Sequence, residues 1–167
     1  MKTIHRITLL LLPILFLSIF SGCKKESEKI VGGMAPDFTL NEITGKPATM
    51  ASYRGKVVLL EFWATWCPPC QMATPDLIKL YEKYNSRGFE LLAVSIDDSL
   101  ESVKAFAAEN KINYHVLFDD RGVNELYGVR SIPITFLIDK TGTIISKHNG
   151  YSPEMADELA KRIESLL

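Results

Sequence analysis

The feature that most constrains this fold is a Cys-x-x-Cys motif set between a buried strand and a helix. The run Val57–Trp63 is continuously apolar apart from one glutamate, which is typical of a central strand covered on both faces. The motif follows at residues 67–70, and from Leu77 to Tyr84 apolar side chains recur at helical spacing. A second apolar run, Phe89–Ile96, comes next. This pattern predicts a βαβ unit whose helix begins with the cysteine pair.

The rest of the chain continues the alternation of helices and strands. Asp98, with Glu101 three residues later, resembles a capping box and predicts a helix that begins there and runs to about Asn110. Ser152 followed by Pro153 predicts the start of a terminal helix. We also expect strands at Tyr114–Phe118, Ile134–Ile138 and Ile144–His148, a helical turn at Gly122–Tyr127 and a hairpin loop at Asp139–Gly142. A chain of 167 residues with this alternation and without internal repeats predicts one α/β domain.

The spacing of the two cysteines favours reversible disulfide chemistry. Residues three apart on a helix are about 5 to 6 Å apart at Cβ, close enough for a disulfide to form with little movement. Cys67 stands where the helix dipole and free N–H groups stabilise a thiolate, so we expect it to attack and Cys70 to resolve the mixed disulfide. Pro68 and Pro69 lack N–H groups, which leaves the Cys70 N–H as the nearest donor. We therefore expect modest thiolate stabilisation and a reducing or intermediate potential.

A Cys-x-x-Cys pair is also found as half of a zinc site, which needs four ligands. In the chain after residue 22, only His115 and His148 add histidine ligands, and neither stands at a ligand spacing. We expect both to be ordinary strand or surface residues. The prediction is a site without metal or cofactor, in which the Cys67–Cys70 dithiol carries the chemistry.

Residues 1–22 have the pattern of an export signal. Two basic residues precede an apolar run at 7–20, which is too short for a comfortable bilayer span but suits a signal-peptide core. The small residues before Cys23 resemble the lipobox of bacterial lipoproteins, which implies cleavage there and a lipid on Cys23. Residues 23–32 would then be a polar tether and residues 33–167 the domain. A plain secretory signal that leaves Cys23 as a free thiol and a retained membrane anchor are the alternatives.

Several segments together resemble the thioredoxin fold, and within it the TlpA/ResA-type branch. The segments that carry the resemblance are Gly33–Leu40, Val57–Cys70, Ser99–Tyr127, Val129–Pro133 and Thr135–Asp139, together with the terminal strand pair and helix. The resemblance covers about residues 33–167. It implies an α/β thioredoxin fold with a central mixed β-sheet flanked by helices, an N-terminal β extension and an αβ insert. Ser131, in place of a frequent glycine, and Ile134, in place of a common threonine, depart from the family pattern near the expected client groove.

The resemblance also implies roles for residues around the cysteines. Pro133 occupies the position of the family's cis-proline, where the backbone of the preceding residue, Ile132, pairs with an extended client. Glu61 matches the buried carboxylate that assists deprotonation of the resolving cysteine, and burial in an apolar strand should raise its pKa. A structural or partly solvated acid is the alternative for Glu61. Trp66 is expected to shield the disulfide and, with the prolines at 68 and 69, to border the client-binding surface.

The leading hypothesis is a lipid-anchored thiol–disulfide oxidoreductase of the bacterial cell envelope. It would act as a monomer on disulfide-containing client proteins and be re-reduced by a membrane thiol electron donor, with cytochrome c maturation or oxidative-stress defence as possible settings. A net charge of −1 gives no basis for nucleic-acid binding. One alternative is a peroxidase of the peroxiredoxin type, whose Pro-x-x-x-Thr-x-x-Cys motif is broken here by Leu60 and Ala64. Another is an anchored adaptor that binds partners without turnover.

Overall fold

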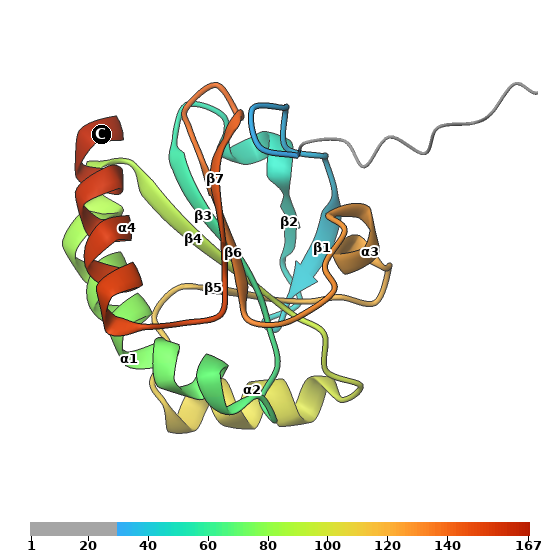
Figure 1. The fold of residues 1–167 in the computed structure, drawn as a ribbon. Helices are drawn as coiled ribbons and strands as arrows, with labels where there is room; N and C mark the ends of the chain where they lie inside the picture. Colours follow the sequence, from blue (N-terminus) through green and yellow to red (C-terminus); the bar gives the residue numbers. More distant parts are fainter. Residues whose placement is uncertain (1–29) are drawn as a thin grey trace, which may run out of the picture.

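Seven strands form one mixed sheet in the computed structural model, which describes residues 30–167 (Figure 1). The strands are β1 Thr39–Glu42, β2 Pro47–Thr49, β3 Val57–Trp63, β4 Phe89–Ser95, β5 His115–Phe118, β6 Ile134–Ile138 and β7 Ile144–Asn149. The helices are α1 Pro68–Tyr84, α2 Leu100–Glu109, α3 Val123–Leu126 and α4 Pro153–Leu166, with 3-10 turns η1 Met50–Tyr53 and η2 Asn85–Arg87. The predicted signal at 1–22, Cys23 and residues 23–29 of the predicted tether lie outside the described residues.

The sheet order is β2-β1-β5-β4-β3-β6-β7. Strand β3 lies between β4, with which it is parallel, and β6, with which it is antiparallel. The helix α1 connects β3 to β4, as the βαβ prediction required. The N-terminal hairpin β1–β2 joins the sheet through antiparallel pairing of β1 with β5, and β5 itself belongs to the predicted αβ insert. The predicted mixed sheet with an N-terminal β extension is therefore confirmed.

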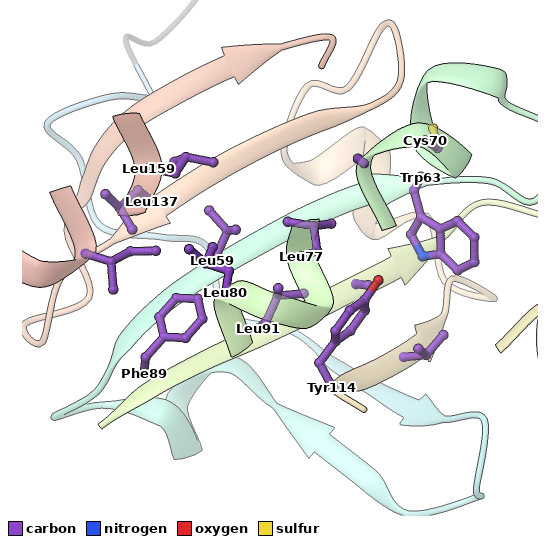
Figure 2. Close-up of a cluster of buried hydrophobic side chains, with 14 of the residues drawn as sticks. Leu59, Trp63, Cys70, Leu77, Leu80, Phe89, Leu91, Tyr114, Leu137 and Leu159 are labelled. Carbon is purple, nitrogen blue, oxygen red and sulfur yellow. The ribbon is translucent and has the colours of Figure 1, made fainter. Parts of the chain in front are cut away.

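The two faces of β3 carry different layers, because alternate side chains of a strand point to opposite sides. Leu59 and Trp63 belong to a cluster packed by α1, α2 and α4, which Figure 2 shows from Leu159 at one end to Cys70 and Trp63 at the other. Leu60 and Phe62 face the opposite layer, which contains η1 and α3. All seven residues of β3 are buried, as the continuous apolar run predicted.

The helix starts were predicted with one error. Ser152 caps α4 by accepting a hydrogen bond from the Met155 N–H, and Pro153 is its first residue, as expected. The cap of α2, however, is Ser99 and not Asp98. The Ser99 backbone is extended, and its hydroxyl accepts from the Ser102 N–H at 3.3 Å. The prediction of a capping box at Asp98 was wrong because the short serine side chain one residue later reaches the third helical N–H.

The segment that precedes β1 is fixed to the β6–β7 hairpin. The Gly32 N–H donates to the Ile144 carbonyl at 2.8 Å, and the Ile144 N–H donates to the Gly33 carbonyl at 2.9 Å. Met34 then forms an antiparallel bridge with Thr143. In Figure 1 the chain enters the domain at this end of the sheet, and α1 begins at the other.

Candidate redox site

The cysteine pair lies where strand β3 passes into helix α1. Cys67 is the N-cap of α1 and its backbone is extended, whereas Cys70 lies within the first turn. The two sulfurs form a disulfide, with the Cα atoms 5.3 Å apart. Pro68 and Pro69 occupy the first helical positions, so the Cys70 N–H is the donor to the Cys67 sulfur, at 3.3 Å. The pair thus has the helix-start position and the single close donor that the sequence predicted.

The surroundings of the pair are apolar and partly exposed. In the disulfide form Cys67 is 4% exposed and Cys70 1%. Trp66, directly before Cys67, is 63% exposed, so its indole stands in solvent next to the pair. Met72, on the exposed side of the same helix, is 65% exposed. The sequence singled out Trp66 and not Met72.

The loop before β6 contains the expected cis-proline. The Ile132–Pro133 peptide is cis, and the Pro133 carbonyl accepts from the Gly150 N–H at 2.8 Å. The Ile132 side chain packs against the cluster that contains both cysteines. Within residues 30–167, the Ile132 backbone makes no hydrogen bond to another residue. Its N–H and carbonyl therefore remain available to an extended peptide.

Glu61 lies inside the sheet on the same side as the cysteines. It is 3% exposed, and its position on β3 places it on the face shared with Leu59 and Trp63. Burial raises the pKa of Glu61 to about 8. Burial is the cause of this shift, and no hydrogen bond opposes it. The hydroxyl of Thr135, which pairs with Glu61 across β3 and β6, is buried without a hydrogen-bond partner among the described residues. Glu61 thus has the raised pKa predicted from its apolar strand.

A second buried carboxylate near the site was missed from the sequence. Asp97, two residues after β4, is 6% exposed and accepts hydrogen bonds from Thr65, the residue after Ala64 in the loop that leads to Cys67. The available signal was topological. Parallel strands end at the same edge of a sheet, so the residues that follow β3 and β4 must meet.

The two histidines lie on strands, as expected. His115 on β5 contacts Glu42 and Glu90, and His148 on β7 contacts Ser146. Among residues 30–167 there is no group of three or more His, Cys, Asp or Glu side chains arranged to hold a metal ion. In the same part of the chain, no helix has the length and apolar character needed to cross a membrane.

Comparisons with known proteins agree on one class. Residues 31–147 match the model of the AhpC/TSA family. The chain is 34% identical to the thiol-disulfide oxidoreductase ResA of Bacillus cereus, over 92% of this chain and 96% of that protein. It is 38% identical to ResA of Geobacillus thermodenitrificans, over 86% and 83% respectively. A crystal structure of a putative thiol:disulfide interchange protein DsbE from Chlorobium tepidum superposes with a TM-score of 0.77 and 35% identity, covering 81% of this chain and 96% of that one.

Proposed function

Because this chain belongs to the AhpC/TSA family and is a thiol–disulfide oxidoreductase, we propose that it reduces disulfides of client proteins with the Cys67–Cys70 dithiol. The observation that carries the proposal is the disulfide-bonded pair at the start of α1, packed in one cluster with Ile132 of the cis-proline loop. This arrangement offers a nucleophile, a resolving thiol and unpaired backbone groups in one place.

The reaction runs in two exchanges. The Cys67 thiolate attacks one sulfur of the client disulfide, which forms a Cys67–client mixed disulfide and releases the other client sulfur as a thiolate that takes up a proton. Cys70 then loses its proton and attacks the Cys67 sulfur. The client leaves with its second thiol, and the pair is left as the disulfide seen in the structure. Two electrons and two protons pass to the client, and a thiol electron donor restores the dithiol.

Glu61 is proposed to handle the proton of Cys70. With a pKa of about 8, the carboxyl is mostly protonated at neutral pH in the disulfide form. It can therefore donate a proton to Cys70 when the pair is re-reduced and accept one when the dithiol is oxidised. A group whose pKa lies near the pH at which the protein works can both donate and accept this proton.

The proposed client-binding surface surrounds the Cys67 sulfur. The unpaired backbone of Ile132, beside Pro133, would add an extended client segment as a further strand. The exposed Trp66 with Pro68 and Pro69 supplies apolar contact on the helix side. Backbone pairing tolerates many client sequences, whereas the apolar contact selects for clients with accessible hydrophobic residues near the disulfide.

We propose that the protein acts in the bacterial cell envelope. The chain would lose residues 1–22, carry a lipid on Cys23, and hold the domain at 33–167 on a tether, as a monomer. The electrons would come from a membrane thiol donor, because spaces outside the cytosol lack its reducing systems. Cytochrome c maturation and defence against oxidative stress are the two settings that suit such a reductase.

The central test is a trapping experiment on the full chain. A Cys70→Ser variant should accumulate disulfide-linked clients at Cys67, and a Cys67→Ser variant should trap none. The intact protein should accelerate insulin reduction by dithiothreitol and leave hydrogen peroxide untouched. Peroxide turnover without disulfide reduction would instead assign a peroxidase, and noncovalent partners alone would assign an adaptor.

The anchoring proposal has its own test. After expression in a bacterium, the full chain should fractionate with membranes and carry the added mass of a lipid on Cys23. A Cys23→Ala variant should lose both properties. A wild-type chain whose mature form begins elsewhere, with a free Cys23 thiol, would contradict the lipid anchor.

A further inference from the structure

The segment that leads into the redox pair is tied to the end of the neighbouring strand. After β3 ends at Trp63, the chain turns through residues 64–67 and enters α1. After β4 ends, its backbone stays in register for one more residue, with the Ile96 N–H donating to the Trp63 carbonyl at 3.0 Å. The next residue, Asp97, therefore stands directly beside the turn.

Asp97 accepts hydrogen bonds from both the backbone N–H and the side-chain hydroxyl of Thr65. The Thr65 N–H lies 3.0 Å from Oδ2 and 3.3 Å from Oδ1, and the Thr65 hydroxyl donates to Oδ1 at 2.5 Å. The Ser95 hydroxyl supports the carboxylate from behind, donating to Oδ2 at 2.7 Å. Both carboxylate oxygens of Asp97 thus accept hydrogen bonds, and together they bind the N–H and the hydroxyl of Thr65.

The other side of Thr65 is held from α1. The Gln71 side-chain amide donates to the Thr65 carbonyl at 2.7 Å. One residue later comes Trp66, and then the Cys67 N–H closes the turn by donating to the Ala64 carbonyl at 3.2 Å. The backbone before the reactive sulfur is therefore fixed at its N–H by Asp97 and at its carbonyl by Gln71.

A buried carboxylate is a costly way to make these bonds. Asp97 is 6% exposed, and no lysine, arginine or histidine within residues 30–167 forms an ion pair with it. Burying a charge without a cation costs free energy that only its hydrogen bonds offset. A neutral acceptor would be the less expensive choice if only packing were needed. The charged fork gives stronger and more directional bonds, which suits a loop that must hold one geometry.

We propose that Asp97 is a positioning residue for thiol–disulfide exchange, which acts through Thr65 to hold Trp66 and the Cys67 sulfur in the geometry that both the client and Cys70 require. The proposal rests on the proposed role of Cys67 and Cys70. Fixing this turn keeps the two sulfurs at a high effective concentration, and it keeps the exposed indole of Trp66 in place for docking. Both the closing of the disulfide and the efficiency of client reduction then depend on a residue that touches neither sulfur.

The test compares two aspartates at opposite ends of the sheet, each of which accepts from the N–H and the hydroxyl of one threonine. Asp139 in the β6–β7 hairpin accepts from the Thr141 N–H at 2.9 Å and the Thr141 hydroxyl at 2.6 Å, far from the redox pair. Asp97→Asn leaves one acceptor oxygen and turns an NH2 group toward a donor, because both oxygens of Asp97 accept hydrogen bonds. Asp139 accepts through Oδ1 alone, so Asp139→Asn keeps its acceptor oxygen and serves as the control for loss of a carboxylate charge far from the redox pair. Thr65→Val removes only the hydroxyl bond, and Thr65→Ser retains both bonds.

Two readouts are measured at temperatures where every variant is fully folded by circular dichroism. We expect Asp97→Asn to lower kcat/KM for insulin reduction about tenfold and Thr65→Val about threefold, the range expected when reacting groups lose their alignment. The equilibrium constant for oxidation of the pair by glutathione disulfide should also fall, by about threefold or more in Asp97→Asn, since a loosened turn lowers the effective concentration of the sulfurs. Thr65→Ser and Asp139→Asn should match the wild type in both.

The outcomes separate this proposal from the proposed function. A wild-type protein that does not reduce insulin would overturn the function itself. Wild-type activity with unchanged kcat/KM and glutathione equilibrium in both Asp97→Asn and Thr65→Val would overturn the positioning role. Equal losses in Asp97→Asn and Asp139→Asn would overturn it as well, since they would reflect general destabilisation. If Asp97→Asn does not fold, Thr65→Val against Thr65→Ser decides the question.

Discussion

Glu61 on β3 and Glu90 on β4 are both buried in neighbouring strands, yet their surroundings have opposite effects. Burial raises the pKa of Glu61 to about 8, and no hydrogen bond acts to lower it. Burial also acts to raise the pKa of Glu90, but hydrogen bonds from His115 and Lys56 outweigh it and bring the pKa to about 2. The partners of an acid, and not its burial alone, decide whether it is charged.

The partners of Glu90 connect several strands. Its carboxylate lies 2.5 Å from Lys56 Nζ, 3.2 Å from His115 Nε2 and 3.2 Å from the Tyr81 hydroxyl. The other ring nitrogen of His115 lies 3.0 Å from Glu42 on β1. This Glu90 network joins β4, β5 and the N-terminal hairpin. The hydrogen-bonded Glu90 carboxylate thus connects strands of the sheet, whereas we propose that Glu61, whose pKa is raised by burial, exchanges a proton with Cys70.

The largest expected effect is on the chemistry of Glu61. In Glu61→Gln, release of the mixed disulfide at Cys67 by Cys70 should slow by about 100-fold, the lower range for loss of a general base. Stopped-flow reaction of the reduced protein with Ellman's reagent gives two phases, one for each thiol. The first phase, attack by Cys67, is the internal control and should not change. An unchanged second phase would make Glu61 as structural as Glu90.

The same substitution should stabilise the fold. Glu61 has a pKa of about 8 in the folded disulfide form against an ordinary value of 4.5, so its folded state favours the proton. Its stabilising contribution is complete below 4.5 and is lost as the pH rises toward about 8. At about pH 7, burial of Glu61 therefore lowers the free energy of unfolding by roughly 3 kcal/mol relative to low pH, from about 1.4 kcal/mol per pH unit. Urea unfolding should therefore find Glu61→Gln more stable than the wild type at about pH 7, with the difference vanishing near pH 4.5.

The matched change on β4 should have the opposite sign. Glu90→Gln should lower the free energy of unfolding by about 2 kcal/mol near pH 6, less than for a fully buried pair because Lys56 is 45% exposed. In the wild type, the depressed pKa makes this contribution complete above 4.5 and progressively lost as the pH falls toward about 2. Urea unfolding at several pH values measures both. A Glu90→Gln protein as stable as the wild type would remove the contrast with Glu61.

The smallest effect is expected at the edge of the Glu90 network. Hydrogen bonding to Glu90 raises the pKa of His115 above its ordinary 6.5, so its contribution is complete below 6.5 and disappears as the pH rises past the raised value. Glu42→Gln should therefore destabilise the protein by less than about 1 kcal/mol, and only while His115 is charged. Amide exchange in β1 should accelerate in the variant at about pH 6 and match the wild type well above the His115 pKa. A His115→Gln background should abolish the difference.

The sequence predicted what depends on local pattern and missed what depends on tertiary contact. The strand–motif–helix order follows from residues 57–84, because periodicity and helix-start chemistry act over a few residues. Asp97 escaped notice because its partner Thr65 is distant in sequence and Asp98 beside it looks the same. The raised pKa of Glu61 was predicted, but the lowered pKa of Glu90 was hidden in the sequence. Both lie in apolar runs, and the groups that separate them come from other elements.

The attachment of residues 32–34 to the β6–β7 hairpin places the entry of the chain and the redox pair at opposite ends of the sheet. The chain enters at the end of the sheet where β3 begins, and Cys67 follows the end where β3 finishes, about 23 Å away for a strand of this length. A lipid on Cys23 would thus attach the domain to the membrane through the end of the sheet opposite the redox pair. Residues 23–32 reach at most about 35 Å when fully extended. With the proposed lipid anchor, clients in the surrounding space would reach the redox pair directly, whereas an electron donor embedded in the bilayer would reach it only after the domain reorients.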